Sequence, residues 1–163
     1  MAAVALIIAI GALGLGAYQV FFVSAPTSTG SGISNTWSDF YYLSVSTNPV
    51  SPTWITIDQL LIDFTVNPGE SAFFLLSTFA TVVAGAPSWI QLNFALDGVI
   101  LGGPTHPWWA LETMGALIEA PVSFHYVLES ISAGAHNLSI HIAGNFVGNQ
   151  IFSSTLLVQT IIS

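Results

Sequence analysis

The hydrophobic pattern divides the chain into two unlike parts, and the first is an unbroken apolar segment. Residues 1–23 are apolar except for Tyr18 and Gln19, so a helix built from them has no polar face. At about 1.5 Å per residue, such a helix is long enough to cross a hydrocarbon layer of about 30 Å. We therefore expect a long hydrophobic α-helix here, surrounded by lipid or by other apolar helices.

The second part consists of short runs of alternating, β-branched and aromatic residues between turn signals. Asp97-Gly98 is a hairpin signal, and the residues 67–70 form a turn by composition. Because no amphipathic helix intervenes, we expect a mainly β chain with an antiparallel β-sandwich of about seven or eight strands, either immunoglobulin-like or jelly-roll. The strands are expected at 40–45, 53–66, 71–83, 89–96, 99–101, 122–130, 137–143 and 150–161.

The segment between these parts, 24–38, is rich in Ser, Thr and Gly and contains Pro26. This composition is typical of an extended, flexible connector. The expected organisation is therefore a hydrophobic helix over 1–23, a linker over 24–38 and one β-sandwich domain over 39–163.

The charge balance narrows the classes of function. The chain has no Lys or Arg and eight Asp or Glu, so it has no fixed cation with which to bind nucleic acid. Only 5% of its residues are charged, against about 25% in ordinary soluble chains. With 53% hydrophobic residues, its surface favours burial in an assembly or a membrane, or a coat of glycans. It also has no cysteine for a disulfide or a thiolate metal site.

The N-terminal segment carries two further signals. Small residues recur four apart, in the pairs Ala5 with Ala9 and Ala12 with Gly16, a spacing that lets helices approach closely. No basic residue precedes the apolar segment, although secretory signals and signal anchors normally begin with one. We expect that a charged leader was cleaved directly before Met1.

With this apolar helix, linker and β-domain, the chain resembles the type IV pilin and archaellin superfamily, particularly its archaeal members. It differs from bacterial pilins, which carry an acidic residue early in the mature helix, whereas Ala5 and its neighbours are neutral. The resemblance implies an extracellular or cell-surface filament, in which identical subunits are inserted in the membrane before they assemble. Their helices would form the core of a helical polymer and their β-domains its outer surface, with a role in adhesion or motility.

The β-domain has a second resemblance. The turn at 67–70, the hairpin at 97–98 and the segment 132–140 are similar to small jelly-roll modules of the tumour-necrosis-factor and complement-like kind. Such modules occur in secreted and virion proteins. The resemblance implies an alternative function, a membrane-anchored virion protein that forms part of a capsid or spike. The strand order that separates a jelly roll from an immunoglobulin-like sandwich is left open by the sequence.

Candidate catalytic and metal-binding residues do not form a recognisable constellation. On one strand, His136 and His141 point to opposite faces because they are five residues apart. No phosphate-binding loop or nucleophile elbow is present, and anionic transition states would lack a Lys or Arg. We therefore expect no enzyme, no cofactor and no metal. The residues considered for these roles are His106, His125, His136 and His141 for a transition metal, Glu112, Glu119 and Glu129 for acid–base catalysis, and Asp58, Asp63 and Asp97 for Ca²⁺.

Three residues remain as candidates for surface contacts. Trp108 and Trp109 follow His106-Pro107 in an aromatic loop that would contact a neighbouring subunit or, in a second alternative function, a sugar in a cell-surface glycan-binding module. Asn137 begins the triplet Asn137-Leu138-Ser139, which makes it the candidate for N-glycosylation.

Overall fold

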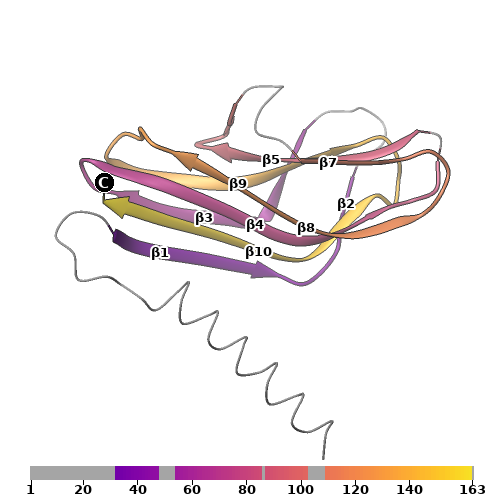
Figure 1. Cartoon of the computed structure of the whole chain (residues 1–163), viewed down its shortest axis with the longest axis horizontal. Coiled ribbons are helices and arrows are strands. Elements are labelled where there is room, and N and C mark those ends of the chain that lie inside the picture. Colours follow the sequence, from indigo (N-terminus) through magenta and orange to yellow (C-terminus); the bar gives the residue numbers. More distant parts are fainter. Residues whose placement is uncertain (1–31, 48–53, 86, 103–108, 163) are drawn as a thin grey trace, which may run out of the picture.

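The computed structural model describes residues 32–47, 54–85, 87–102 and 109–162, and within these ranges it is entirely β (Figure 1). None of the described segments is a helix that could cross a membrane. The helix expected over 1–23 and its small residues Ala5, Ala9, Ala12 and Gly16 lie outside the described residues. The strands are β1 (Gly32–Tyr41), β2 (Val45–Ser46), β3 (Ile55–Val66), β4 (Glu70–Val82), β5 (Ser88–Leu96), β6 (Val99–Ile100), β7 (Trp109–Thr113), β8 (Ile118–Leu128), β9 (Gly134–Gly144) and β10 (Gln150–Ile162).

These strands form two antiparallel five-stranded sheets that pack face to face (Figure 1). Sheet A has the order β1-β10-β4-β8, with β2 also paired to β10. Sheet B has the order β3-β9-β5-β6, with β7 also paired to β5. The expected antiparallel β-sandwich is confirmed.

The strand pairing is nested. Strand β5 pairs with β7, β4 with β8, β3 with β9, and β1 with β10. The chain therefore runs as one long antiparallel ribbon that is wound between the two sheets, which is the jelly-roll arrangement. In an immunoglobulin-like sandwich the first two long strands would pair within one sheet, but here the first two long strands, β1 and β3, lie in different sheets. Of the two sandwich types left open by the sequence, the strand order is that of the jelly roll.

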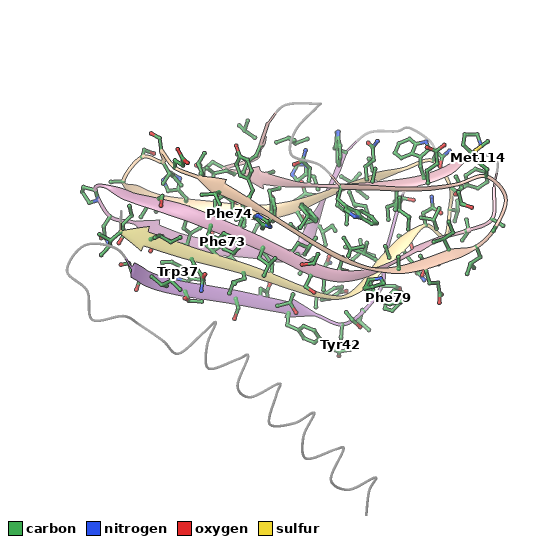
Figure 2. All side chains as sticks on the ribbon, in the orientation of Figure 1. Trp37, Tyr42, Phe73, Phe74, Phe79 and Met114 are labelled. Atoms are coloured by element: carbon green, nitrogen blue, oxygen red, sulfur yellow. The ribbon has the colours of Figure 1, made fainter. Side chains whose placement is uncertain are left out.

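The core lies between the sheets and follows from the alternation of side chains along each strand. On β4, Phe74 and Leu76 are fully buried, whereas Ser77 between two buried positions is exposed. The side chains of both sheets fill the space between the layers (Figure 2). A row of aromatic rings connects the sheets, with centroid distances of 5.9 Å from Phe64 to Phe74, 5.9 Å from Phe74 to Phe94 and 4.8 Å from Phe94 to Phe124.

Some local features of the fold differ from the expectation. The hairpin at Asp97-Gly98 is confirmed: φ is 51° and 78°, so both residues have the positive values of a type I′ turn. Residues 32–38, expected in the linker, belong to β1, and β7 was not expected. Strand β1 escapes sequence detection because it is an edge strand, paired only with β10, and most of its side chains are polar and solvent-accessible. The division into helix, linker and domain otherwise stays a prediction.

Candidate functional site

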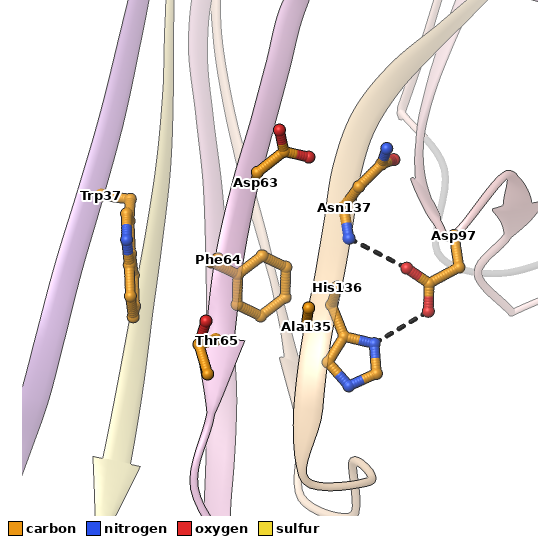
Figure 3. A pocket seen from close by; sticks show the side chains of 8 residues that line it. All are labelled: Trp37, Asp63, Phe64, Thr65, Asp97, Ala135, His136 and Asn137. Atoms are coloured by element: carbon orange, nitrogen blue, oxygen red, sulfur yellow. Dashed lines mark hydrogen bonds and ion pairs between the residues drawn. The ribbon is translucent and has the colours of Figure 1, made fainter.

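A surface cavity of about 390 Å³ lies at the end of the sandwich where β3 and β5 finish and β9 begins (Figure 3). It brings together residues from both sheets that are far apart in the sequence. Its lining combines aromatic rings, two carboxylates, an amide and an imidazole. The lining residues are Trp37, Asp63, Phe64, Thr65, Asp97, Ala135, His136 and Asn137.

His136 is the most constrained polar group of this cavity. Its side chain is only 8% exposed, and its Nδ1 lies 2.8 Å from Oδ2 of Asp97. Its Nε2 lies 2.8 Å from the carbonyl oxygen of Ser132. Carboxylate and carbonyl oxygens can only accept, so these two contacts favour the doubly protonated imidazolium form of the ring. The hydrogen bond to Asp97 accordingly raises the pKa of His136, against the opposing effect of burial.

Asp97 fixes the β5–β6 hairpin to β9 (Figure 3). Its Oδ1 accepts a hydrogen bond of 2.9 Å from the backbone nitrogen of Asn137, and its own backbone nitrogen donates to the carbonyl of Asn137 at 2.8 Å. Partial burial acts to raise the pKa of Asp97, but the hydrogen bonds from His136 and Asn137 hold it below its usual value. Asp97 and His136 therefore form a staple between two strands of sheet B and the loop that contains Ser132.

A second carboxylate, that of Glu70, lies at the same end of the sandwich, at the start of β4 after the turn from β3. Glu70 is 5% exposed and accepts hydrogen bonds from the backbone nitrogen of Asn67 at 2.9 Å and from its side-chain amide at 3.0 Å. Hydrogen bonds from the side chain of Asn67, the side chain of Ser34 and the backbone of Asn67 lower the pKa of Glu70 to about 2. The ionised carboxylate thus orders the turn between β3 and β4.

The arrangement offers little for catalysis. Both nitrogens of His136 are engaged, so neither is free to act as a general base. In the described ranges, no group of three or more His, Asp or Glu could hold a metal ion. Glu119 and Glu129 stand at opposite ends of β8 in sheet A, and Glu112 lies on β7 of sheet B, so the three carboxylates do not form one cluster.

The remaining described histidines are dispersed. His125 is exposed on the outer surface of sheet A and stacks on Phe73, with ring centroids 5.6 Å apart. His141 is placed opposite Asn93 in sheet B, and burial lowers its pKa. His106 lies outside the described residues.

The expected contact residues are only partly visible. Trp108 lies outside the described residues, and Trp109 is half-buried against the core, opposite the fully buried Leu92. The surface of Trp109 that a partner could contact is therefore smaller than it would be in an exposed loop. Asn137 is half-buried on the central strand β9, and the hydroxyl-bearing Ser139 of its glycosylation triplet is buried.

The sequence reasoning missed the Asp97–His136 staple. Asp97 was considered as a hairpin residue and as a Ca²⁺ ligand, and His136, 39 positions further along the chain, as a metal ligand, but the two were not paired. A possible signal was the combination of a hairpin Asp with a His in a chain that has no Lys or Arg, because histidine is then the only side chain that can pair with a carboxylate.

The chain matches no family model and no curated protein. Among solved structures it is similar to the VP2 subviral particle of infectious bursal disease virus, with 15% identity and a TM-score of 0.42 over 85% of this chain and 34% of that chain. It is also similar to a structure of the Gx strain of that virus, with 12% identity and a TM-score of 0.41 over 78% of this chain and 33% of that chain. Dimeric latent PorU from Porphyromonas gingivalis has 8% identity and a TM-score of 0.36 over 83% of this chain and 14% of that chain.

This chain therefore spans about a third of the length of the viral chains it matches. Scores and identities this low establish no family. The resemblance to the pilin and archaellin superfamily is nevertheless wrong. The described residues are entirely β, without a helix, and their strands follow the order of a jelly roll. The expectation of a pilus or archaellum filament for adhesion or motility falls with it.

The staple predicts a pH dependence of stability. The folded-state pKa of His136 is above its ordinary value of 6.5, so its contribution is complete below pH 6.5 and is lost as the pH rises through the folded-state pKa. We expect His136→Asn to lower the free energy of unfolding by about 1.5–3 kcal/mol at acidic pH, with the difference from wild type shrinking as the pH rises. Denaturant unfolding at a series of pH values measures this, with His125→Asn as an exposed control. A difference that does not change with pH contradicts the imidazolium assignment.

Glu70 predicts the opposite dependence. Its folded-state pKa is lowered from 4.5 to about 2, so its contribution is complete above pH 4.5 and is lost as the pH falls toward 2. Glu70→Gln should lower the free energy of unfolding by about 1–3 kcal/mol at neutral pH. It should also lose less stability than wild type when the pH falls from 4.5 toward 2. The exposed Glu112→Gln should change stability by no more than about 0.5 kcal/mol. Equal acid sensitivity in wild type and Glu70→Gln would show that the turn does not depend on this carboxylate.

Proposed function

We propose that the protein is a non-enzymatic structural subunit whose jelly-roll domains pack against one another to build part of a shell, as a virion capsid or spike protein does. Jelly rolls serve both as capsid and as lectin domains, so the fold alone leaves this choice open. The nature of the surface supports assembly.

The observation that carries the proposal is apolar surface that remains after the core is complete. The sandwich already buries a continuous core between its sheets. Large hydrophobic side chains nevertheless remain exposed in turns and on strands, among them Met114 at 76% (Figure 2), Val147 at 71% and Tyr42 at 68%. In an ordinary soluble monomer, charged residues would separate such groups, but only 5% of this chain is charged. Contacts with identical subunits would remove this surface from water.

The polar groups of the described residues support a structural role as well. The constrained ones serve as ties within the fold: Asp97 and His136 join two strands, and Glu70 orders a turn. Another tie is Asn149, fully buried, whose amide donates to the carbonyl of Trp89 and accepts from the backbone nitrogen of Val83, both near 2.9 Å. A subunit that must fit its neighbours needs such a rigid frame.

The proposal predicts a defined assembly of the full chain. Light scattering after size-exclusion chromatography should give a mass that is a large multiple of 17.2 kDa, and electron microscopy should show closed particles with point-group symmetry. A monomer of 17.2 kDa at about 10 μM, far above the Kd of a stable assembly, would overturn the proposal. Helical filaments with a screw axis, or amorphous aggregates without a defined mass, would overturn it too.

A further inference from the structure

The outer surface of sheet A between Glu119 and Glu129, which we call the neutral face, carries no carboxylate among the described residues. It consists of the side chains of four adjacent strands that point away from the core. The registers place Leu75 between Leu157 and His125, and Ser77 between Thr155 and Ser123. Its members are Thr36, Ser38 and Phe40 on β1, Phe152, Thr155, Leu157, Gln159 and Ile161 on β10, Ser71, Phe73, Leu75, Ser77 and Phe79 on β4, and Pro121, Ser123, His125 and Val127 on β8.

The neutral face carries apolar side chains that the core does not need. Phe40 is 59% exposed and Val127 is 45% exposed. Phe79 and Phe152 pack side by side on this surface, with ring centroids 5.1 Å apart. The apolar run of Phe73 to Leu76 explains how this arises, because consecutive apolar residues on a strand supply both the core and the outer surface.

The carboxylates lie at the margins of this face or away from it. Glu119 stands at one end of β8, and Glu129 follows its other end. The other six carboxylates of the chain lie on different surfaces or are engaged in the staple and turn described above; they are Asp39, Asp58, Asp63, Glu70, Asp97 and Glu112. The centre of the neutral face is therefore uncharged.

Two of the sheet edges, in contrast, are protected against pairing with another chain. Strand β8 is an edge of sheet A and contains Pro121, which cannot donate a backbone hydrogen bond. Strand β3 is an edge of sheet B, where the exposed Asp58 and Asp63 disfavour another copy. Pairing through these two edges is thus disfavoured, whereas exposed side chains of the neutral face, such as Phe40 and Val127, are left uncovered by the described residues.

We infer that the neutral face is a self-association surface that packs against the neutral face of a second copy, an inference that rests on the proposed function and identifies one of its contacts, because a two-fold contact alone closes at a dimer. A basic partner could form ion pairs only with Glu119 and Glu129 at the margins of the face. The same two carboxylates would repel an acidic partner. A second copy presents the same uncharged centre, and a two-fold axis lets one patch be complementary to itself.

The size of the face fits this partner. Its members span nine residues of β4, from Ser71 to Phe79, and seven of β8, from Pro121 to Val127. With strands spaced by about 4.8 Å and residues by about 3.3 Å, the four strands of the face cover roughly 500 Å². Two such faces would bury roughly 1,000 Å², at the lower end of the range for specific protein interfaces.

A new carboxylate at the centre of the face tests the inference. Ser77 is exposed there, so Ser77→Glu should leave the fold intact, as circular dichroism would verify. Because like charges would then face one another, the Kd for self-association of the full chain should rise by more than about tenfold. Sedimentation velocity measures this change. Ser77→Gln, of similar size but uncharged, should associate like wild type. Ala110→Glu, which adds the same charge to an exposed position on β7 of sheet B, should also associate like wild type.

The outcomes separate the two proposals. If wild type assembles and Ser77→Glu assembles equally well, the neutral face is not the contact, although the structural role stands. If Ala110→Glu dissociates the assembly as strongly as Ser77→Glu, or Ser77→Gln dissociates it too, a specific effect of charge on this face is ruled out. If wild type is a monomer, the proposed function itself fails.

Discussion

The absence of Lys and Arg is the constraint on which the rest of the structure depends. Each of the eight carboxylates must be solvated, bound to backbone and amide N–H groups, or paired with a histidine. Glu70 uses the N–H groups of Asn67, and Asp97 uses the backbone of Asn137 together with the ring of His136. The two most constrained carboxylates therefore become ties within the fold, at the end of the sandwich where several strands begin or finish.

The same constraint shapes the surface. With few charges to place, the chain covers one side of sheet A with hydroxyl, amide and apolar groups, while Asp58 and Asp63 lie on the exposed positions of β3. A jelly roll presents two broad sheet faces. Exposing the apolar side chains of such an uncharged face to water costs free energy, and burial against another molecule removes this cost. Scarce charge, a rigid frame and the proposed self-association thus share one origin in the composition.

Local sequence signals predicted the sandwich and much of its strand content, because hydrophobic alternation and the Asp97-Gly98 turn act over short distances. They could not predict the jelly-roll order, which depends on pairings such as Gly32 with Ile162 at opposite ends of the domain. Most of the polar edge strand β1 was predicted as linker. The staple between Asp97 and His136 could not be predicted, because the two residues are 39 positions apart and no local pattern connects them. The pilin resemblance failed because it rested on the N-terminal composition and the overall layout rather than on strand order.

Salt dependence tests most directly whether association rests on uncharged surface. Sedimentation velocity of the full chain between about 0.05 M and about 1 M NaCl would vary the screening length from about 14 Å to about 3 Å. The account predicts that association stays constant or strengthens, since salt screens the repulsion among carboxylates and leaves apolar contacts intact. Dissociation at high salt would contradict it, because it would mean that ion pairs hold the subunits together.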